Sequence, residues 1–437
     1  MNISKQSKLM KKSMLAAGIA LALTSTSSYA INLYDKDGTT LDFNGLGLIG
    51  AFSSDQDYYP FPSPESSPSW QEATITYGLY ANKQLDNNSV YGGLAAISTW
   101  VGGDGDAAGV SSGNESSKTD IEEAFAGIRG DGWDFSFGQQ GFKIGTGFLM
   151  WDDGFNPGDF GGAAPELNRG GTYWMGGASR KSFDETAILR LGYDEGFRGD
   201  IFWLQSGNKA QAETELAGFN IEHNSEMGQL GLTYLKGLDV TPSGALFGSF
   251  DNPQRDGQET ISVRYQGSAG VENLSLAAEF VDQDQGDNSK DANAWYAEAG
   301  WSFADTAWAP LVSYRYSTFD ENFDFLFYGA SQPYGTWFQG EIAGNYAGPV
   351  NTNADIQHLS AIVHPSPVLR LGASYFNFDD NSALNNDGDE VNLWAEWVVN
   401  DNLIVSPLVG FYKPDSAVVQ GNTDTNTHFQ LIAIVPF

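Results

Sequence analysis

The sequence predicts an all-β protein, a transmembrane antiparallel β-barrel of about 18 strands (with about 16 as the other count). Three observations predict this fold class. Apolar and polar residues alternate with period two through most of the chain, and short connections between these segments alternate with long ones. After the N-terminal leader, no run of about 18 apolar residues appears that could cross a bilayer as a helix.

The first 30 residues have the layout of a secretory signal peptide. A basic head from Lys5 to Lys12 precedes an apolar run, Met14 to Thr24, which is too short to span a membrane. Ser28-Tyr29-Ala30 then suits cleavage after Ala30. We therefore expect an exported chain in which residues 31–437 form a single barrel domain.

The composition excludes several classes of function. The 437 residues carry 55 Asp and Glu against 22 Lys and Arg, a formal net charge of −33, so the chain does not attract the phosphates of nucleic acids. It has no cysteine, which excludes disulfides, thiolate metal sites and cysteine nucleophiles. We expect no cofactor and no bound metal.

The alternation assigns residues to two faces. In residues 258–266, Ile261 and Val263 share one face, and Thr260 and Arg264 share the other. In a soluble sandwich the apolar face would pack on a second sheet. In a membrane barrel it would face lipid, with the polar face toward a lumen. Periodicity alone does not separate these two folds.

The connection lengths favour the barrel. Short turns such as 86–88 and 131–132 alternate with long connections near 102–118, 141–182 and 321–353. Outer-membrane barrels have short periplasmic turns and long external loops, whereas a sandwich has no reason to keep that order. The expected strands are 39–52, 70–85, 89–101, 119–130, 133–140, 183–194, 199–207, 215–224, 227–238, 258–268, 272–283, 291–303, 309–320, 354–366, 368–379, 389–399, 402–413 and 426–437.

The last predicted strand ends the chain on an aromatic residue. Phe429, Leu431, Ala433 and Val435 alternate with other residues before the terminal Phe437. This ending resembles that of outer-membrane barrels, where it is read as an assembly signal. The resemblance implies two partners, outer-membrane lipid and the barrel-assembly machinery.

Three segments resemble the general porins of Gram-negative bacteria. Residues 123–140, EAFAGIRGDGWDFSFGQQ, resemble their fourth and fifth strands, and 33–45 resemble their start. Residues 158–162, GDFGG, resemble the Pro-Glu-Phe-Gly-Gly motif of the third porin loop. The chain departs at Gln139, where the family commonly has Arg, and at Asp159, where it has Glu. General porins have about 16 strands, and 18 is the size of sugar-selective and substrate-selective porins.

This resemblance implies a homotrimeric outer-membrane channel for small hydrophilic solutes and ions. Residues 141–182 would fold inward as the constriction, anchored by apolar residues such as Phe148. Acids on the loop would face arginines across the pore, and the excess of acids predicts cation preference. The predicted acids are Asp152, Asp153, Asp159 and Glu166. The predicted arginines are Arg129, Arg190, Arg264, Arg315 and Arg370 on the wall and Arg180 on the loop.

Other functions remain as alternatives. A carbohydrate-selective, maltoporin-like channel would use aromatic rings that stack on sugars, for which the candidates are Trp151, Tyr173, Trp174 and Trp337. A non-channel barrel or a secreted β-sheet enzyme is less favoured. The acidic stretch from Asp152 lacks EF-hand spacing, no G-x-S-x-G or H-E-x-x-H occurs, and sequence gives no carboxylate separation for a glycosidase. We therefore expect no enzyme.

Overall fold

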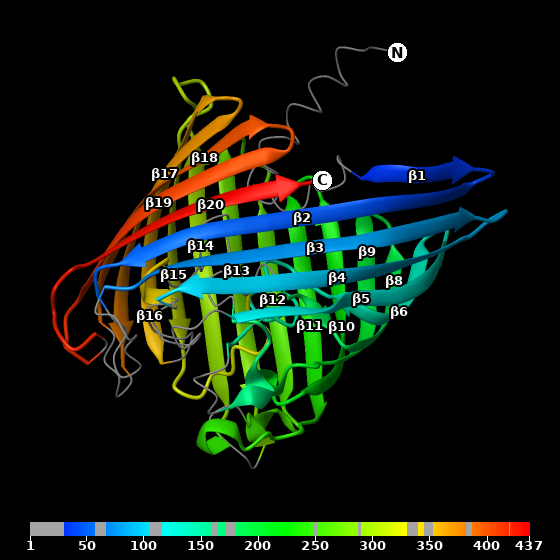
Figure 1. Cartoon of the computed structure of the whole chain (residues 1–437), viewed down its shortest axis with the longest axis horizontal. Helices are drawn as coiled ribbons and strands as arrows, with labels where there is room; N and C mark the ends of the chain where they lie inside the picture. The colour runs from blue at the N-terminus through cyan, green and yellow to red at the C-terminus, as the bar shows by residue number, and fades with distance from the viewer. Residues whose placement is uncertain are drawn as a thin grey trace.

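Each alternating segment pairs with its neighbours in the chain, and the first and last strands of the series pair with each other to close a barrel (Figure 1). The structure is a computed structural model that describes residues 30–56, 67–104, 116–154, 156–158, 164–171, 180–248, 251–286, 290–329, 340–344, 353–381, 387–418 and 420–437. Over these residues, no helix has the length and apolar character needed to span a bilayer.

Within the described residues the barrel has 18 antiparallel strands, as predicted. They are β2 (Thr39–Ser54), β3 (Ser69–Gln84), β4 (Ser89–Gly103), β5 (Ser116–Gly130), β6 (Trp133–Gly141), β8 (Glu185–Gly192), β9 (Gly196–Gln205), β10 (Glu215–Ser225), β11 (Gly228–Asp239), β12 (Glu259–Gly267), β13 (Leu274–Asp284), β14 (Ala292–Ser302), β15 (Leu311–Phe319), β16 (Ala354–Ser366), β17 (Leu369–Asp380), β18 (Gly388–Asn400), β19 (Leu403–Pro414) and β20 (Asn426–Pro436). In Figure 1, β2 to β4 cross the direction of β11 to β14 steeply, as expected when the strands of a barrel tilt against its axis.

Some elements were not predicted. They are β1 (Ile31–Lys36), the two-residue β7 (Ser182–Phe183), and the short 3₁₀ turns η3 (Pro165–Leu167), η4 (Lys209–Gln211), η5 (Ala245–Gly248) and η6 (Pro253–Arg255). β1 pairs with β2 from Phe43 to Thr39, directly beyond the point where Phe437 exchanges backbone hydrogen bonds of 2.6 and 2.9 Å with Gly45. The two ends of the described chain therefore share one edge of β2.

The predicted faces are confirmed on β12. Ile261 and Val263 are 49% and 53% exposed on the outside, whereas Thr260 and Arg264 are buried inside. An outward apolar belt and an inward polar face are what a lipid-embedded barrel requires. The turns at 131–132, 226–227 and 401–402 lie at one end of the barrel, and the long connections lie at the other.

Part of the barrel interior is filled by an apolar core. Phe142, Phe148 and Met150 from the segment after β6 pack there with Phe327 from the segment after β15. Wall residues such as Phe202 complete the cluster. Burying each large apolar side chain contributes about 2 kcal/mol, so this core holds the inward segments firmly against the wall.

Candidate functional site

The predicted constriction loop does fold into the barrel. After β6 the chain turns at Gly145 and Gly147, whose φ angles of +55° and +84° favour glycine. The backbone N–H of Ile144 donates to Met150 O at 3.0 Å, and that of Asp152 donates to Phe142 O at 3.0 Å. Residues 142–152 thus form a narrow antiparallel projection, which we call the inner finger.

Aromatic contacts attach the inner finger to the wall. The ring of Phe148 lies 5.1 Å from that of Tyr296 on β14, and Phe142 lies 4.5 Å from Phe202 on β9. Thr146 Oγ1 is 3.3 Å from the hydroxyl of Tyr296. The anchoring expected of Phe148 is therefore present in the structure.

A second inward segment, residues 320–329 after β15, lies against the inner finger. Trp151 N–H donates to Phe327 O at 2.9 Å, and Phe327 N–H donates to Leu149 O at 3.1 Å. Gly329 N–H donates to Gly147 O at 3.3 Å. Two segments therefore pack together inside the barrel, and one of them was expected from the sequence.

A buried ion pair fixes this second segment. Arg255, on η6, donates to both carboxylate oxygens of Asp324 at 2.8 and 2.9 Å, to Gln211 Oε1 at 2.8 Å and to Leu326 O at 3.3 Å. Burial raises the pKa of Asp324, but Arg255 more than offsets this, so the pKa lies below its ordinary value. One arginine thereby joins the segments after β9, β11 and β15.

Asp152 and Lys143 form the titratable part of the inner finger. Asp152 has φ +91° and is half-buried, and burial raises its pKa to about 8, although Lys181 and Lys143 oppose the shift. Lys143 Nζ lies 3.4 Å from the ring centroid of Trp151, and burial lowers its pKa to about 8. At neutral pH the lysine is mostly charged and the aspartate mostly neutral.

Asp153 is fully buried beside the wall. Ser206 Oγ lies 2.9 and 3.0 Å from its two oxygens, and Arg169 Nη1 lies 3.7 Å away. Burial raises its pKa to about 6, against the opposing charge of Arg169. This carboxylate therefore joins the constriction loop to the end of β9 in the described structure.

Glu122 holds the C-terminal root of the constriction loop, which sequence reasoning missed. It accepts backbone hydrogen bonds from Lys181 at 2.5 Å and Ser182 at 3.1 Å, and Arg180 Nε lies 2.9 Å away. A bulge makes Glu122 the extra residue of β5, so the adjacent Glu123 also reaches an inward group, the hydroxyl of Tyr80 at 2.6 Å. The sequence signal that could have indicated this site is the pair of adjacent glutamates, which breaks the alternation of the strand.

A row of charged residues crosses the inner wall. Arg264 forms an ion pair with Glu222 and donates to Asn220 Oδ1 at 2.5 Å, and Arg198 Nη2 lies 2.5 Å from the same Glu222. Gly231, on the strand between, makes room, because a Cβ there would lie 2.5 Å from Arg264 Cζ. The row is thus continuous from β9 to β12.

Replacing Gly231 with Ala is expected to lower the free energy of unfolding by about 1–3 kcal/mol, because the added methyl group overlaps the Arg264 guanidinium and weakens its hydrogen bonds. Urea unfolding in detergent would measure this loss. Gly47→Ala is the matched control, since a Cβ there has its nearest neighbour at 3.7 Å. Equal unfolding midpoints for the two variants would contradict the prediction.

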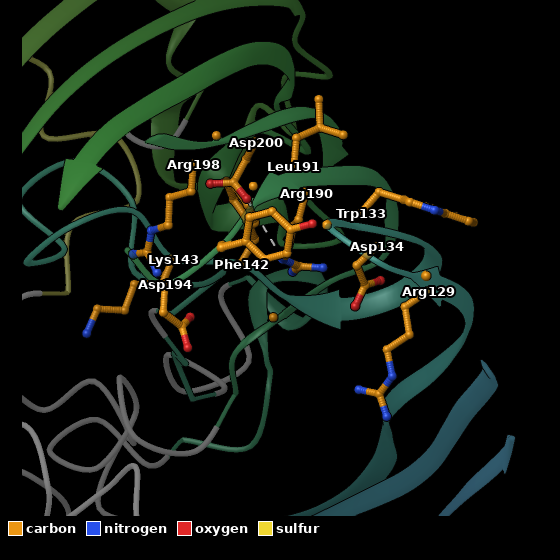
Figure 2. Close-up of a pocket in the computed structure, with 16 residues that line it drawn as sticks. Arg129, Trp133, Asp134, Phe142, Lys143, Arg190, Leu191, Asp194, Arg198 and Asp200 are labelled. Atoms are coloured by element: carbon orange, nitrogen blue, oxygen red, sulfur yellow. Dashed lines mark ion pairs between the residues drawn. The ribbon is translucent and has the colours of Figure 1, made fainter. Parts of the chain in front are cut away.

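A cavity of about 440 Å³ is lined in part by Phe142 and Lys143 of the inner finger (Figure 2). The charged residues lining it come from β5, β6, β8, β9, the turn after β8 and the root of the constriction loop. They are Arg129, Lys143, Arg190, Arg198, Asp134, Asp194 and Asp200. Arg190 Nε lies 4.0 Å from Asp200, so opposite charges face each other in this water-accessible space.

The other predicted arginines are distributed over the wall. Arg129 donates to Ser89 Oγ at 3.0 Å near the short-turn end. Arg315 is fully buried with Glu298 at 3.4 Å, and Arg370 is buried with Glu396 at 2.9 Å. The structure thus brings Arg129, Arg190 and the inner finger to one cavity, whereas the other predicted wall arginines do not line it.

The remaining predicted residues lie elsewhere. Glu166 is exposed on η3. Asp159, Tyr173, Trp174 and Trp337 lie outside the described residues. Over the part of the chain that the structure describes, no group of His, Asp and Glu side chains is arranged to hold a metal ion. The roles assigned to the predicted acids and arginines in the pore stay predictions.

A closed barrel with inward loops is a fold found among outer-membrane channels. No known family description and no curated protein matches the sequence. Solved structures do match. The outer membrane protein opdK of Pseudomonas aeruginosa has a TM-score of 0.58 at 11% identity, over 91% of this chain and 98% of its own. OccAB3 of Acinetobacter baumannii has a TM-score of 0.59 at 8% identity, over 90% of this chain and 99% of its own.

A third solved structure, Pseudomonas aeruginosa OpdQ, has a TM-score of 0.56 at 12% identity, over 92% of this chain and 99% of its own. These three proteins are outer-membrane channels of the OprD/Occ family. At such low identity, the likeness shows that this chain shares their 18-stranded barrel fold.

Proposed function

We propose that the protein is an outer-membrane channel through which small hydrophilic solutes and ions diffuse passively. The observation that carries the proposal is the closed 18-stranded barrel, whose inner wall is polar and charged and whose loops narrow the lumen. A barrel of this size encloses an aqueous path, and its outward apolar belt suits lipid. The fold shared with OprD/Occ channels supports the same conclusion.

Cation preference is the finer part of this proposal. It is supported by the excess of 55 acids over 22 basic residues in the whole chain. The positive and negative charges that line the described cavity nearly balance each other. The inner finger has a charged Lys143 beside a mostly neutral Asp152 at pH 7. The proposed preference therefore depends on the chain as a whole rather than on the inner finger.

The carbohydrate-selective alternative gains no support. Sugar stacking needs an open aromatic face, but Lys143 lies over the ring of Trp151, and the backbone of Trp151 is bonded to Phe327. Export through a signal peptide cleaved after Ala30, assembly through Phe437 and a homotrimeric state belong to the same proposal. The low-identity fold match supports an outer-membrane location for the protein.

Planar-bilayer recording tests the function. Purified, refolded protein is expected to insert and give discrete conductance steps in KCl, because an open polar lumen passes ions. Under a KCl gradient the reversal potential should have the sign of cation preference. A heat-modifiable gel band would show that the sample is folded. Folded protein that gives no conductance would refute the channel, and an anion-selective reversal potential would refute the preference.

A further inference from the structure

A second buried carboxylate holds a loop segment inside the barrel. Glu390, on β18, is fully buried. Its Oε1 accepts backbone N–H bonds from Glu341 at 2.6 Å and Ile342 at 3.0 Å, and its Oε2 accepts one from Ala343 at 2.7 Å. Asn392 Nδ2 donates to Oε1 at 2.6 Å. All these partners donate, and the side chain of Glu390 accepts from them through both of its carboxyl oxygens.

The backbone of this segment is shaped to surround an anion. Consecutive N–H groups that converge on one point form an anion-binding nest. Gly340, at the start of the segment, has φ +77°, and a Cβ there would lie 2.7 Å from Glu390 Oε1. Only glycine fits this approach without displacing the carboxylate or the segment.

The segment packs inside the barrel near the long-loop end of the wall, since Glu390 is the third residue of β18. Ile342 and Ala343 are fully buried and belong to the same apolar core as Phe376, Phe378 and Tyr412 on β17 and β19. They are also in the same core as the inner finger. Residues 340–344 therefore occupy lumen space beside the constriction.

The arrangement repeats what Glu122 does on β5, at another place on the barrel wall. Glu122 accepts the backbone N–H groups of Lys181 and Ser182 at the root of the constriction loop. Glu390 does the same for the connection between β15 and β16. Each inward loop is thus held by one glutamate that a wall strand supplies.

We propose that Glu390 is a positioning residue that holds residues 340–344 in the lumen and thereby sets the bore of the channel. The inference rests on the channel function proposed above. Without the carboxylate the N–H groups lose their common acceptor, so the segment leaves the wall and the channel widens. The residue acts on the solute path through the loop and not by contact with the solute.

Replacing Glu390 with Gln is the first test. Single-channel conductance is expected to shift to a larger value with more frequent transitions between levels, because an amide offers one acceptor oxygen where the carboxylate offers two. Asp389→Asn is the matched control. It removes the same charge one residue away, where the carboxylate accepts from Tyr375 and Asn377 instead. The control should keep the wild-type conductance.

A reversible tether separates positioning from general damage. The chain has no cysteine, and a Cβ at Gly410 would lie 3.3 Å from Ile342 Cγ1, so cysteines at 342 and 410 would be within disulfide reach. Ile342→Cys with Gly410→Cys, added to Glu390→Gln, should restore the wild-type conductance when oxidised and lose it on reduction. A merely structural defect would not respond to the redox state.

Gly340→Ala tests the contact between Glu390 and the loop by changing the loop. This variant tests the inference if Glu390→Gln does not fold. It should also enlarge the conductance, since its methyl group displaces the carboxylate. Wild-type conductance in both folded variants, or no response to the tether, would overturn the inference. Absence of conductance in folded wild-type protein would instead refute the channel function.

Discussion

Replacing Arg255 with Met is expected to lower the free energy of unfolding by about 3–5 kcal/mol, the cost of leaving a buried charge without its partner. Asp324 would keep a fully buried carboxylate after losing two hydrogen bonds of 2.8 and 2.9 Å. Gln211 and Leu326 O would lose a donor as well. The loss is large because one guanidinium satisfies acceptors from several segments.

Urea unfolding, followed by the heat-modifiable gel shift, would measure the change. A double-mutant cycle with Asp324→Asn isolates the pair, since removing both charges should cost less than the sum of the two single changes. Lys236→Met is the control, because Lys236 and Glu259 form an ion pair of 2.8 Å whose members are both exposed. An exposed ion pair contributes little to stability. This explanation would be contradicted if Arg255→Met lost no more stability than Lys236→Met.

The same pair predicts a response to acid. The pKa of Asp324 lies below its ordinary value in the folded protein. The folded protein therefore binds a proton at the Asp324 carboxylate less tightly than the unfolded chain does. This contribution to stability is present above the unfolded pKa of 3.8 and is lost as pH falls through the folded pKa. Arg255→Met should remove that part of the acid dependence.

The barrel could be predicted because its physical cause is repeated along the whole chain. Every strand has one face toward lipid and the other toward the lumen, so apolar and polar residues alternate with period two in each strand. Each alternating segment therefore supports the same interpretation of the others. The strand ends were correct to within a few residues. β1 was missed because its residues, Ile31 to Lys36, are exposed on both faces and so carry no alternation.

The constriction could be predicted only in part, since its contacts join residues far apart in sequence. Arg264 was expected on the inner wall, but nothing local indicates Glu222 as its partner or Gly231 as the space between them. The adjacent pair Glu122 and Glu123 breaks the alternation, and only the bulge explains how both find inward partners. Local rules thus fail at the places where loops meet the wall.

The second inward loop had a weaker sequence signal than the first. Residues 320–329 are acidic, with Asp320, Glu321 and Asp324, but they have one glycine and so lack the glycine-rich character of the first loop. Their position depends on long-range contacts, through Arg255 on one side and the backbone of the inner finger on the other. Such pairings are set by tertiary packing, which a pattern read along one chain does not contain.

Raising the pH from about 7 to about 9 is expected to increase the permeability ratio of cations over anions by roughly 3- to 10-fold. Lys143 and Asp152 both have a pKa of about 8. Across this range the lysine loses its positive charge and the aspartate gains a negative one, so the net charge of the inner finger changes sign from positive to negative. Lys181 opposes the upward shift of the Asp152 pKa, because its charge favours the ionised carboxylate.

Reversal potentials under a fixed KCl gradient, recorded at several pH values, would measure this change. The double variant Lys143→Met with Asp152→Asn removes both titrating groups, and asparagine tolerates the positive φ of Asp152. Its ion selectivity should stay nearly constant over the same range, while the conductance persists. The explanation fails if the double variant shifts as much as the wild type, because other groups would then carry the titration, or if wild-type selectivity moves toward anions as the pH rises.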